Sequence, residues 1–358
     1  MKRRSFLKNA AAGVAASTVA APAIAQSQPA IQWRLAASWP KSLDTLFGGA
    51  DLIARRVSEV TDGKFQIRTF AAGEIVPATQ VLDAIQAGTV ELGHTAAYYY
   101  FGKDPAFSMA TSIPFGGTAR QNFAWWMYGG GLELWKEAYA PFGVLPMPGG
   151  NSGTQMGGWF RKEIKSLDDL KGLKMRIPGL GGEALQRAGG TPVTLAGGEI
   201  FTALETGAID ATEWIGPYND LAFGLYKAAK FYYYPGWHEP GSSLEAIINQ
   251  QAFDSLPADL QEIVLTCCHV INETMNAEFV ARNSEALQSL VNDHDVELRR
   301  FPDDVLRTLR ELSYQVIEEG AASDPFYARV YESLRAYQER SAAYLKVAEE
   351  AYLQARSL

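Results

Sequence analysis

The chain has 358 residues, of which 47% are hydrophobic and 20% are charged, a composition typical of a globular protein with room for two lobes. Its formal net charge of −8, without a basic stripe to meet phosphates, argues against a nucleic-acid-binding protein. The two cysteines, Cys267 and Cys268, are adjacent in a helical pattern, where a bond between them would be strained. We expect buried thiols, although an oxidising compartment leaves the strained bond open.

The first 25 residues have the features of a twin-arginine export signal. Arg3 and Arg4 precede an alanine-rich, mildly apolar run, and Ala23-x-Ala25 suits a signal peptidase. The apolar run is too short and too weakly hydrophobic to span a bilayer. We therefore expect a periplasmic protein that folds before it is exported.

Strands and helices alternate in the first part of the chain. Strands are predicted at 31–37, 64–70 and 89–96, with helical spacing over 44–60 and 79–88 between them. This order favours an α/β fold with a parallel or mixed sheet.

A short internal repeat indicates a second unit of similar design. Residues 84–93 align without a gap with residues 203–212, and each copy follows a Gly-Glu-Ile triplet. In each copy a glycine, Gly88 or Gly207, suits the end of a helix before a buried strand. Any α/β protein can contain such units, but the shared triplet favours two lobes.

The segment LKMRI (173–177) is predicted to be a short strand that Pro178-Gly179 ends. Arg176 therefore lies near a strand end, where ligands bind in open α/β sheets, and a guanidinium there can hold a carboxylate with two hydrogen bonds. The alternative is a surface arginine paired with Asp168 or Asp169. No G-x-S-x-G, P-loop or H-E-x-x-H motif indicates an enzyme, and no histidine–cysteine spacing indicates a zinc site.

The last hundred residues are predicted to be helical, and Asp324-Pro325 is a start signal for a long final helix reaching about Arg356. Its apolar positions have heptad spacing. They are Val330, Leu334, Tyr337, Ser341, Tyr344, Ala348 and Ala351. The helix can lie across both lobes or reach a second subunit, and the pattern favours neither.

Three segments, 165–179, 198–214 and 252–264, resemble the extracytoplasmic solute receptors of tripartite ATP-independent periplasmic (TRAP) transporters. The resemblance covers nearly the whole chain after the signal. It implies a non-enzymatic binding protein with the two-lobe periplasmic-binding-protein fold, in which hinge-linked lobes are bridged by long helices. Such receptors deliver organic anions to membrane permease subunits. Arg176 inherits the role of the arginine that pairs with the substrate carboxylate.

The resemblance also divides the chain. Residues 1–25 form the signal, 26–150 lobe I and 151–240 lobe II. Residues 241–323 return to lobe I and supply spanning helices. Residues 324–358 form an extra C-terminal helix, which implies a possible homodimer.

The motifs TEW, GGNSGTQMGGWF and PGWHEPGS are similar to the subgroup that binds 2-oxo and 2-hydroxy monocarboxylates such as pyruvate. In that subgroup a metal cation lies against the ligand. Matching positions make the metal ligands Gln155, Glu213, the Trp214 carbonyl and Glu239. Na⁺ or Ca²⁺ accepts such oxygen ligands, and would be a partner for a Glu213 carboxylate that is costly to bury alone.

The predicted substrate contacts are Arg176, Gln155, Trp214, Asn151 and Tyr100, where Tyr100 supplies a hydroxyl. Weaker candidates for the wall are Phe70, Trp39 and Tyr218, and Trp237 and His238 adjoin Glu239 without an argument of their own. Three alternatives remain open. They are a receptor of the same family for a dicarboxylate, sugar acid or larger carboxylate, a twin-arginine-exported enzyme, and the binding protein of an ATP-driven transporter.

Overall fold

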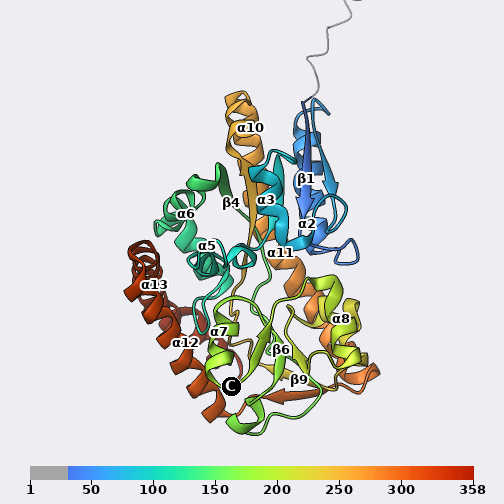
Figure 1. Ribbon diagram of the computed structural model, residues 1–358, viewed down its shortest axis with the longest axis vertical. Helices are drawn as coiled ribbons and strands as arrows, with labels where there is room; N and C mark the ends of the chain where they lie inside the picture. Colours follow the sequence, from blue (N-terminus) through green and yellow to red (C-terminus); the bar gives the residue numbers. More distant parts are fainter. Residues whose placement is uncertain (1–30) are drawn as a thin grey trace, which may run out of the picture.

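The computed structural model describes residues 31–358, which form two β-sheets surrounded by helices (Figure 1). The α/β fold expected from the order of the elements is confirmed. The predicted export signal lies outside the described residues. Within this part of the chain, none of the helices is both long enough and apolar enough to serve as a membrane span.

The first sheet has the strand order β2-β1-β3-β10-β4. The strands β2, β1 and β3 are parallel, as the predicted strand–helix units require, whereas β10 runs antiparallel to both of its neighbours. The strands are β1 (Ile31–Ala37), β2 (Phe65–Phe70), β3 (Leu92–Thr95), β4 (Val144–Asn151) and β10 (Ser243–Asn249). The helices of this half are α2 (Leu46–Val60), α3 (Val81–Gln86), α4 (Phe107–Thr111), α5 (Ala119–Tyr128), α6 (Gly131–Tyr139) and α10 (Gln250–Asp254).

The second sheet has the order β11-β9-β5-β8-β6-β7, and its strands are shorter. They are β5 (Gly158–Phe160), β6 (Lys174–Arg176), β7 (Thr191–Val193), β8 (Ala211–Thr212), β9 (Phe231–Tyr234) and β11 (Glu297–Arg300). Its helices are α7 (Gly179–Arg187), α8 (Gly197–Thr206) and α9 (Pro217–Phe223). The strands β6, β7 and β8 are parallel to one another, so their carboxyl ends lie at one edge.

The internal repeat corresponds to one helix–strand unit in each sheet. In the first sheet α3 leads into β3, and in the second α8 leads into β8. Gly88 and Gly207 follow the two helices with φ of 69° and 76°, a left-handed conformation that glycine adopts without strain. The repeat therefore marks equivalent turns in the two halves.

Several segments connect the two halves. The chain passes from β4 to β5 and returns from β9 to β10, and α11 (Ala258–Asp293) packs against β4 and α2 on one side and α9 on the other. Direct contacts include a 2.9 Å hydrogen bond from the Tyr218 hydroxyl to Asp44 and another from the Asn219 amide to Thr45. Both cysteines of α11 are buried free thiols, as expected. The lobe boundaries given above stay a prediction.

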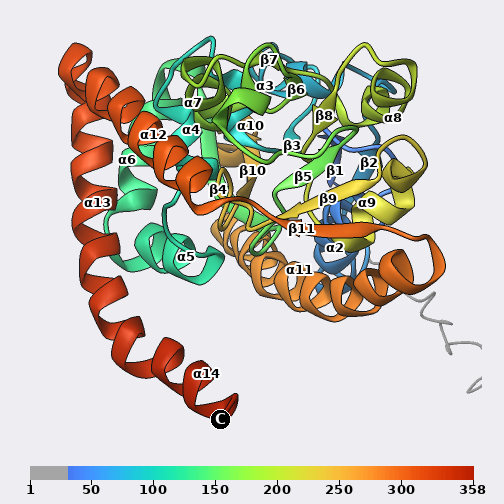
Figure 2. The same ribbon diagram turned by 90° about the horizontal axis from the view of Figure 1, so that it is seen from below.

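The C-terminal region begins with α12 (Asp303–Ser323), which packs on α7 and on α13 (Pro325–Leu345). The Asp324 side chain caps α13 by accepting hydrogen bonds from the amides of Phe326 and Tyr327 at 2.7 and 2.9 Å. A π-helical turn over Lys346–Glu350 then leads to α14 (Ala351–Arg356), which extends away from the body (Figure 2). The predicted heptad seam is buried at Val330 and Leu334, where α13 packs on α5 and α6, and exposed at Tyr344.

The first sheet also buries a carboxyl group away from Arg176 and Glu213, that of Glu245. Glu245 in β10 has no exposed surface and accepts hydrogen bonds from the Trp135 indole at 2.6 Å and the Tyr139 hydroxyl at 2.7 Å. Burial raises the pKa of Glu245 to about 7, although the two hydrogen bonds oppose the shift.

We therefore expect Glu245 to make the protein less stable as the pH rises. The unfolded carboxyl ionises near its ordinary pKa of 4.5, whereas the folded one stays protonated until about 7, so its stabilising effect is present below pH 4.5 and is lost as the pH rises to 7. The loss is at most about 3 kcal/mol. The check is urea unfolding of the wild type and Glu245→Gln at pH 5 and pH 8. The variant should lose less stability than the wild type between the two, and equal losses would contradict the assignment.

Candidate functional site

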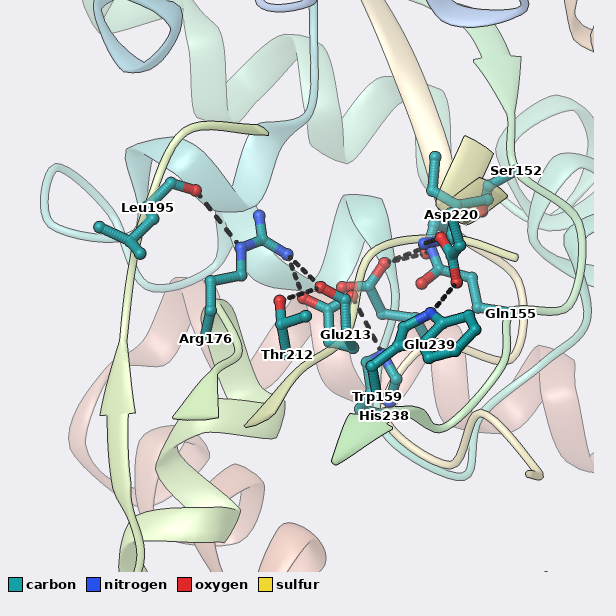
Figure 3. A network of polar contacts seen from close by, with 12 residues as sticks. Ser152, Gln155, Trp159, Arg176, Leu195, Thr212, Glu213, Asp220, His238 and Glu239 are labelled. Atoms are coloured by element: carbon teal, nitrogen blue, oxygen red, sulfur yellow. Dashed lines mark hydrogen bonds and ion pairs between the residues drawn. The ribbon is translucent and has the colours of Figure 1, made fainter. Parts of the chain in front are cut away.

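Arg176 and Glu213 form a buried ion pair at the edge where β6 and β8 end. Arg176 is the last residue of β6 and Glu213 directly follows β8, and the Glu213 amide donates to the Arg176 carbonyl at 3.2 Å. The guanidinium Nη1 contacts Glu213 Oε1, and neither residue has exposed surface (Figure 3). Arg176 is therefore no surface arginine, and Asp168 pairs with Lys171 instead.

The guanidinium of Arg176 is held on three sides. Its Nε donates to the Leu195 carbonyl at 3.3 Å, and its Cζ lies 5.1 Å from the centre of a Trp214 ring. Burial alone would lower the pKa of Arg176, but Glu213 and the neighbouring tyrosines and Glu239 together outweigh it, and the net shift is upward. Arg176 therefore remains a cation inside the protein.

His238 is the second partner of Glu213. Its Nε2 lies 3.3 Å from Glu213 Oε2, and the imidazole is 2% exposed. The sequence resemblance implies a bound cation as the partner of Glu213, whereas Arg176 and His238 are its partners in the structure. The only signal for His238 in the sequence was its place beside Glu239.

Gln155 and Glu239 form an adjoining polar cluster. The Gln155 amide nitrogen donates to Glu239 at 2.8 Å, and also lies 3.0 Å from the Ser152 hydroxyl and 3.1 Å from that of Ser242. Burial, followed by the charge of Glu213, raises the pKa of Glu239 to about 7. This leaves Gln155 Oε1 buried and unpaired within residues 31–358.

These residues suit a hard cation. One ligand atom each from Glu213, His238 and Glu239 lie within 4.8 Å of one another, and Gln155 Oε1 has no other partner in the described chain. Two carboxylates and an amide oxygen are the ligands that Na⁺ and Ca²⁺ accept. The donor set fits the cation implied by the sequence resemblance.

The three consecutive tyrosines, residues 98–100, do not lie as expected, and the predicted substrate contact of Tyr100 is corrected. Residues Ala97–Tyr100 form a 3₁₀ turn and not a strand, so Ala97 and Tyr100 share a face and both enter the core of the first half. The Tyr100 hydroxyl bonds to Thr95 at 2.9 Å and accepts from the Leu82 amide at 3.2 Å, so it is not available to a ligand. The Tyr99 hydroxyl is buried and unpaired among the described residues, and it replaces Tyr100 as the candidate.

The remaining candidates differ in position. Asn151 ties the end of β4 to α11 by donating to the Asn272 carbonyl at 2.9 Å, and it also accepts from the Gly153 amide, so its side chain is occupied. The ring of Trp39 lies 6.4 Å from that of Trp214, which places Trp39 at the wall of the site.

The other two wall candidates lie elsewhere. Phe70 stacks with Arg68 in an open surface groove, and Tyr218 bonds to Asp44 and Arg282 between the halves.

Five unpaired polar atoms in the described chain belong to Arg176 or to residues around the ion pair. Within residues 31–358, the buried side-chain atoms without a hydrogen-bond partner include Arg176 Nη2, Trp214 Nε1, the Tyr99 hydroxyl, Gln155 Oε1 and His238 Nδ1. Buried polar groups are nearly always hydrogen-bonded, so such a group of atoms marks a place for a ligand. Three of them are donors, which suits an anion, and the oxygen of Gln155 suits a cation.

Comparisons with known proteins agree with this geometry. Residues 35–324 match the family described as "Bacterial extracellular solute-binding protein, family 7". A relative from Nostoc sp., named a monocarboxylate 2-oxoacid-binding periplasmic protein, is 48% identical over 360 residues and 98% of each chain.

Two crystal structures of TRAP solute-binding proteins are similar over almost the whole fold. The protein from Bordetella bronchiseptica, a mixed occupancy dimer with calcium and picolinate bound in one site, has a TM-score of 0.90 and 42% identity, covering 92% of this chain and 98% of its own. The protein from Pseudoalteromonas atlantica, with bound sodium and pyruvate, has a TM-score of 0.88 and 42% identity, covering 90% of this chain and 98% of its own.

The buried ion pair predicts a large loss of stability when one partner is removed. Arg176→Met leaves Glu213 as a buried charge beside His238, and we expect it to lower the free energy of unfolding by about 3–5 kcal/mol. Adding Glu213→Gln should restore part of this. Urea unfolding of the single and double variants is the measurement.

The matched control is the more exposed ion pair of Arg187 and Glu319, whose nitrogen and oxygen atoms are 2.5 Å apart. Arg187→Met should cost less than about 1 kcal/mol because solvent screens that pair. Similar losses for Arg176→Met and Arg187→Met would contradict the role given to the buried pair.

Proposed function

The chain belongs to family 7 of the bacterial extracellular solute-binding proteins, and within it we propose a TRAP receptor for a small 2-oxo or 2-hydroxy monocarboxylate such as pyruvate, bound with Na⁺ or Ca²⁺. The observation that carries the proposal is the buried, partly unpaired guanidinium of Arg176 beside Glu213. The 48% identical relative named for 2-oxoacids, and the related structures with pyruvate and with metal ions, support it.

Different residues of the site bind the anion and the cation. Arg176 holds the carboxylate through its free Nη2, while Trp214 covers the flat face of the ligand and the Tyr99 hydroxyl donates to an oxygen. Gln155, Glu213, Glu239 and the Trp214 carbonyl hold the cation. When bound, the cation offsets the two carboxylates and is chelated by one carboxylate oxygen and the 2-oxygen of the ligand.

The charges of the site favour one carboxylate in the ligand. Arg176 is the permanent cation among the site residues described above, and Glu213 and Glu239 are acidic. A second carboxylate would be buried without a partner, which is costly. A dicarboxylate or sugar acid is therefore the weaker alternative.

The proposed mechanism is capture and not catalysis. Proteins of this family are solute-binding transport proteins, and the open form takes anion and cation into the cleft before the lobes close by a hinge motion. The closed form then docks on the membrane permease. We place this step in the periplasm, where the predicted signal at residues 1–25 would direct the chain.

The test is calorimetric titration of ligand-free protein with pyruvate in buffers that contain Na⁺, Ca²⁺ or neither. We expect saturable binding that depends on one cation. Arg176→Lys should weaken it about tenfold or more, because an ammonium cannot reach Glu213, the Leu195 carbonyl and the ligand with the fixed, planar set of donors that a guanidinium has. Arg187→Lys, far from the site, is the control and should bind as the wild type. Binding that ignores both cations would remove the metal role, and no binding would reject 2-oxo acids.

We also propose a homodimer through the C-terminal helix. The related Bordetella structure is a dimer. Beyond Leu345 this helix exposes three large apolar side chains, Val347 at 76%, Tyr352 at 63% and Leu353 at 45%, outside the hydrophobic core of the described chain. Light scattering should give a dimer for the wild type and a monomer after deletion of residues 344–358, with pyruvate affinity unchanged. A monomeric wild type would contradict this.

A further inference from the structure

The backbone carbonyl groups of Glu213, Trp214 and Ile215 differ in their hydrogen-bond partners. The Glu213 carbonyl accepts from the Thr212 hydroxyl at 2.8 Å, and the Ile215 carbonyl accepts from the Met156 amide at 2.9 Å. The Trp214 carbonyl between them accepts no hydrogen bond from any residue in 31–358, although Trp214 is only 4% exposed. Buried carbonyls are rarely left unpaired, so this oxygen is available to a ligand.

The orientation of that carbonyl is set by the other side of the same peptide. The Ile215 amide shares a peptide plane with the Trp214 carbonyl, and it donates to Asp220 Oδ1 at 3.3 Å. In a trans peptide the N–H and C=O bonds point in opposite directions. A partner that holds the Ile215 amide therefore turns the Trp214 oxygen away from Asp220.

Asp220 is itself fixed in place. It lies in α9 with 1% exposure, and its Oδ2 accepts from the Trp159 indole at 2.9 Å and from the Tyr232 hydroxyl at 2.7 Å (Figure 3). The rings of Trp159 and Tyr232 stack with centres 4.0 Å apart. Trp159 in β5 and Tyr232 in β9 thus hold Asp220 Oδ2. The other oxygen, Asp220 Oδ1, accepts from the Ile215 amide.

We propose that Asp220 is a positioning residue for the bound cation, which holds the Trp214–Ile215 peptide so that the Trp214 carbonyl faces the site. The inference rests on the proposed function, in which that carbonyl is a cation ligand. It adds a residue that touches neither anion nor cation. Partners of this kind orient ligand groups and also polarise them, because a hydrogen-bond acceptor on the N–H side of a peptide makes the carbonyl oxygen of that peptide a stronger acceptor.

The test compares Asp220→Asn with Tyr232→Phe. Asp220→Asn leaves one acceptor oxygen where Asp220 has two. Keeping that oxygen on the Trp159 and Tyr232 donors turns the NH2 group toward Ile215, whose backbone N–H loses its acceptor. Tyr232→Phe removes one donor to Asp220 and keeps the bond to Ile215. The affinity for Na⁺ or Ca²⁺ is measured by titration at saturating pyruvate. Amide hydrogen exchange at Ile215 is measured on the same samples.

We expect Asp220→Asn to weaken cation affinity about 10–100-fold and to accelerate exchange at Ile215, while Tyr232→Phe stays within about threefold of the wild type. Asp220→Asn with faster exchange at Ile215 and normal cation affinity would overturn the proposal. Equal losses in the two variants would also overturn it, because they would indicate general loosening of lobe II.

Two further outcomes keep the test decisive. If the wild type binds pyruvate without any cation dependence, the cation part of the proposed function fails, and the role of Asp220 fails with it. If Asp220→Asn does not fold, hydrogen exchange of the wild-type protein with pyruvate bound, measured with and without the cation, tests the proposal. Adding the cation should then slow exchange at Ile215 more than at Tyr218, whose amide bonds to Asn283, and equal slowing would overturn the proposal.

Discussion

The buried ion pair between Arg176 and Glu213 is the constraint on which the rest of the site depends. Two charges without exposed surface are stable only if each is paired and its remaining hydrogen-bonding atoms find partners. The register of β6 and β8 brings them together, because Arg176 lies opposite Thr212 and Glu213 follows directly. His238 and the Leu195 carbonyl complete the shell, yet Arg176 Nη2 stays unpaired in the described chain. The fold thus holds a cationic donor with a free N–H group in the protein interior.

The same pair explains why an anion and a cation are proposed to bind together. A carboxylate brought to Arg176 alone would meet the charge of Glu213, and a metal ion brought to Glu213 and Glu239 alone would meet the charge of Arg176. Bound side by side, the anion and the cation neutralise each other's charge. Arg176 and Glu213 can then stay paired, or Arg176 can pair with the anion and Glu213 with the cation. The proposed preference for small monocarboxylates then follows from the number of charges at the site, since Arg176 is the only permanent cation among its described residues.

The two halves contribute differently to this site. Most of its polar groups belong to the second sheet and its loops, where β5, β8 and β9 fix the backbone, and this half presents a preorganised surface. The first half contributes aromatic groups, Tyr99 and Trp39, and the latter is held by a 2.7 Å hydrogen bond to His94. Contacts from both sides of the cleft are what allow a ligand to stabilise closure. The likeness to proteins crystallised with pyruvate and with metal ions is consistent with this division.

Local periodicity and backbone preference were enough to predict the strands β1, β2, β3 and β6, the two glycine turns of the repeat and the helix start at Asp324. The strands β4, β5, β9, β10 and β11 were not predicted from the sequence. The sequence also indicated Arg176, Glu213, Gln155 and Glu239, but through resemblance to a family and not through spacing alone. Which tyrosine hydroxyl is free depends on tertiary packing, because the 3₁₀ turn that follows β3 sends Tyr100 into the core. Tertiary packing also brought His238 to Glu213 and Asp220 behind Trp214. Such partners are set by which strands lie side by side, and no local pattern in the sequence encodes that.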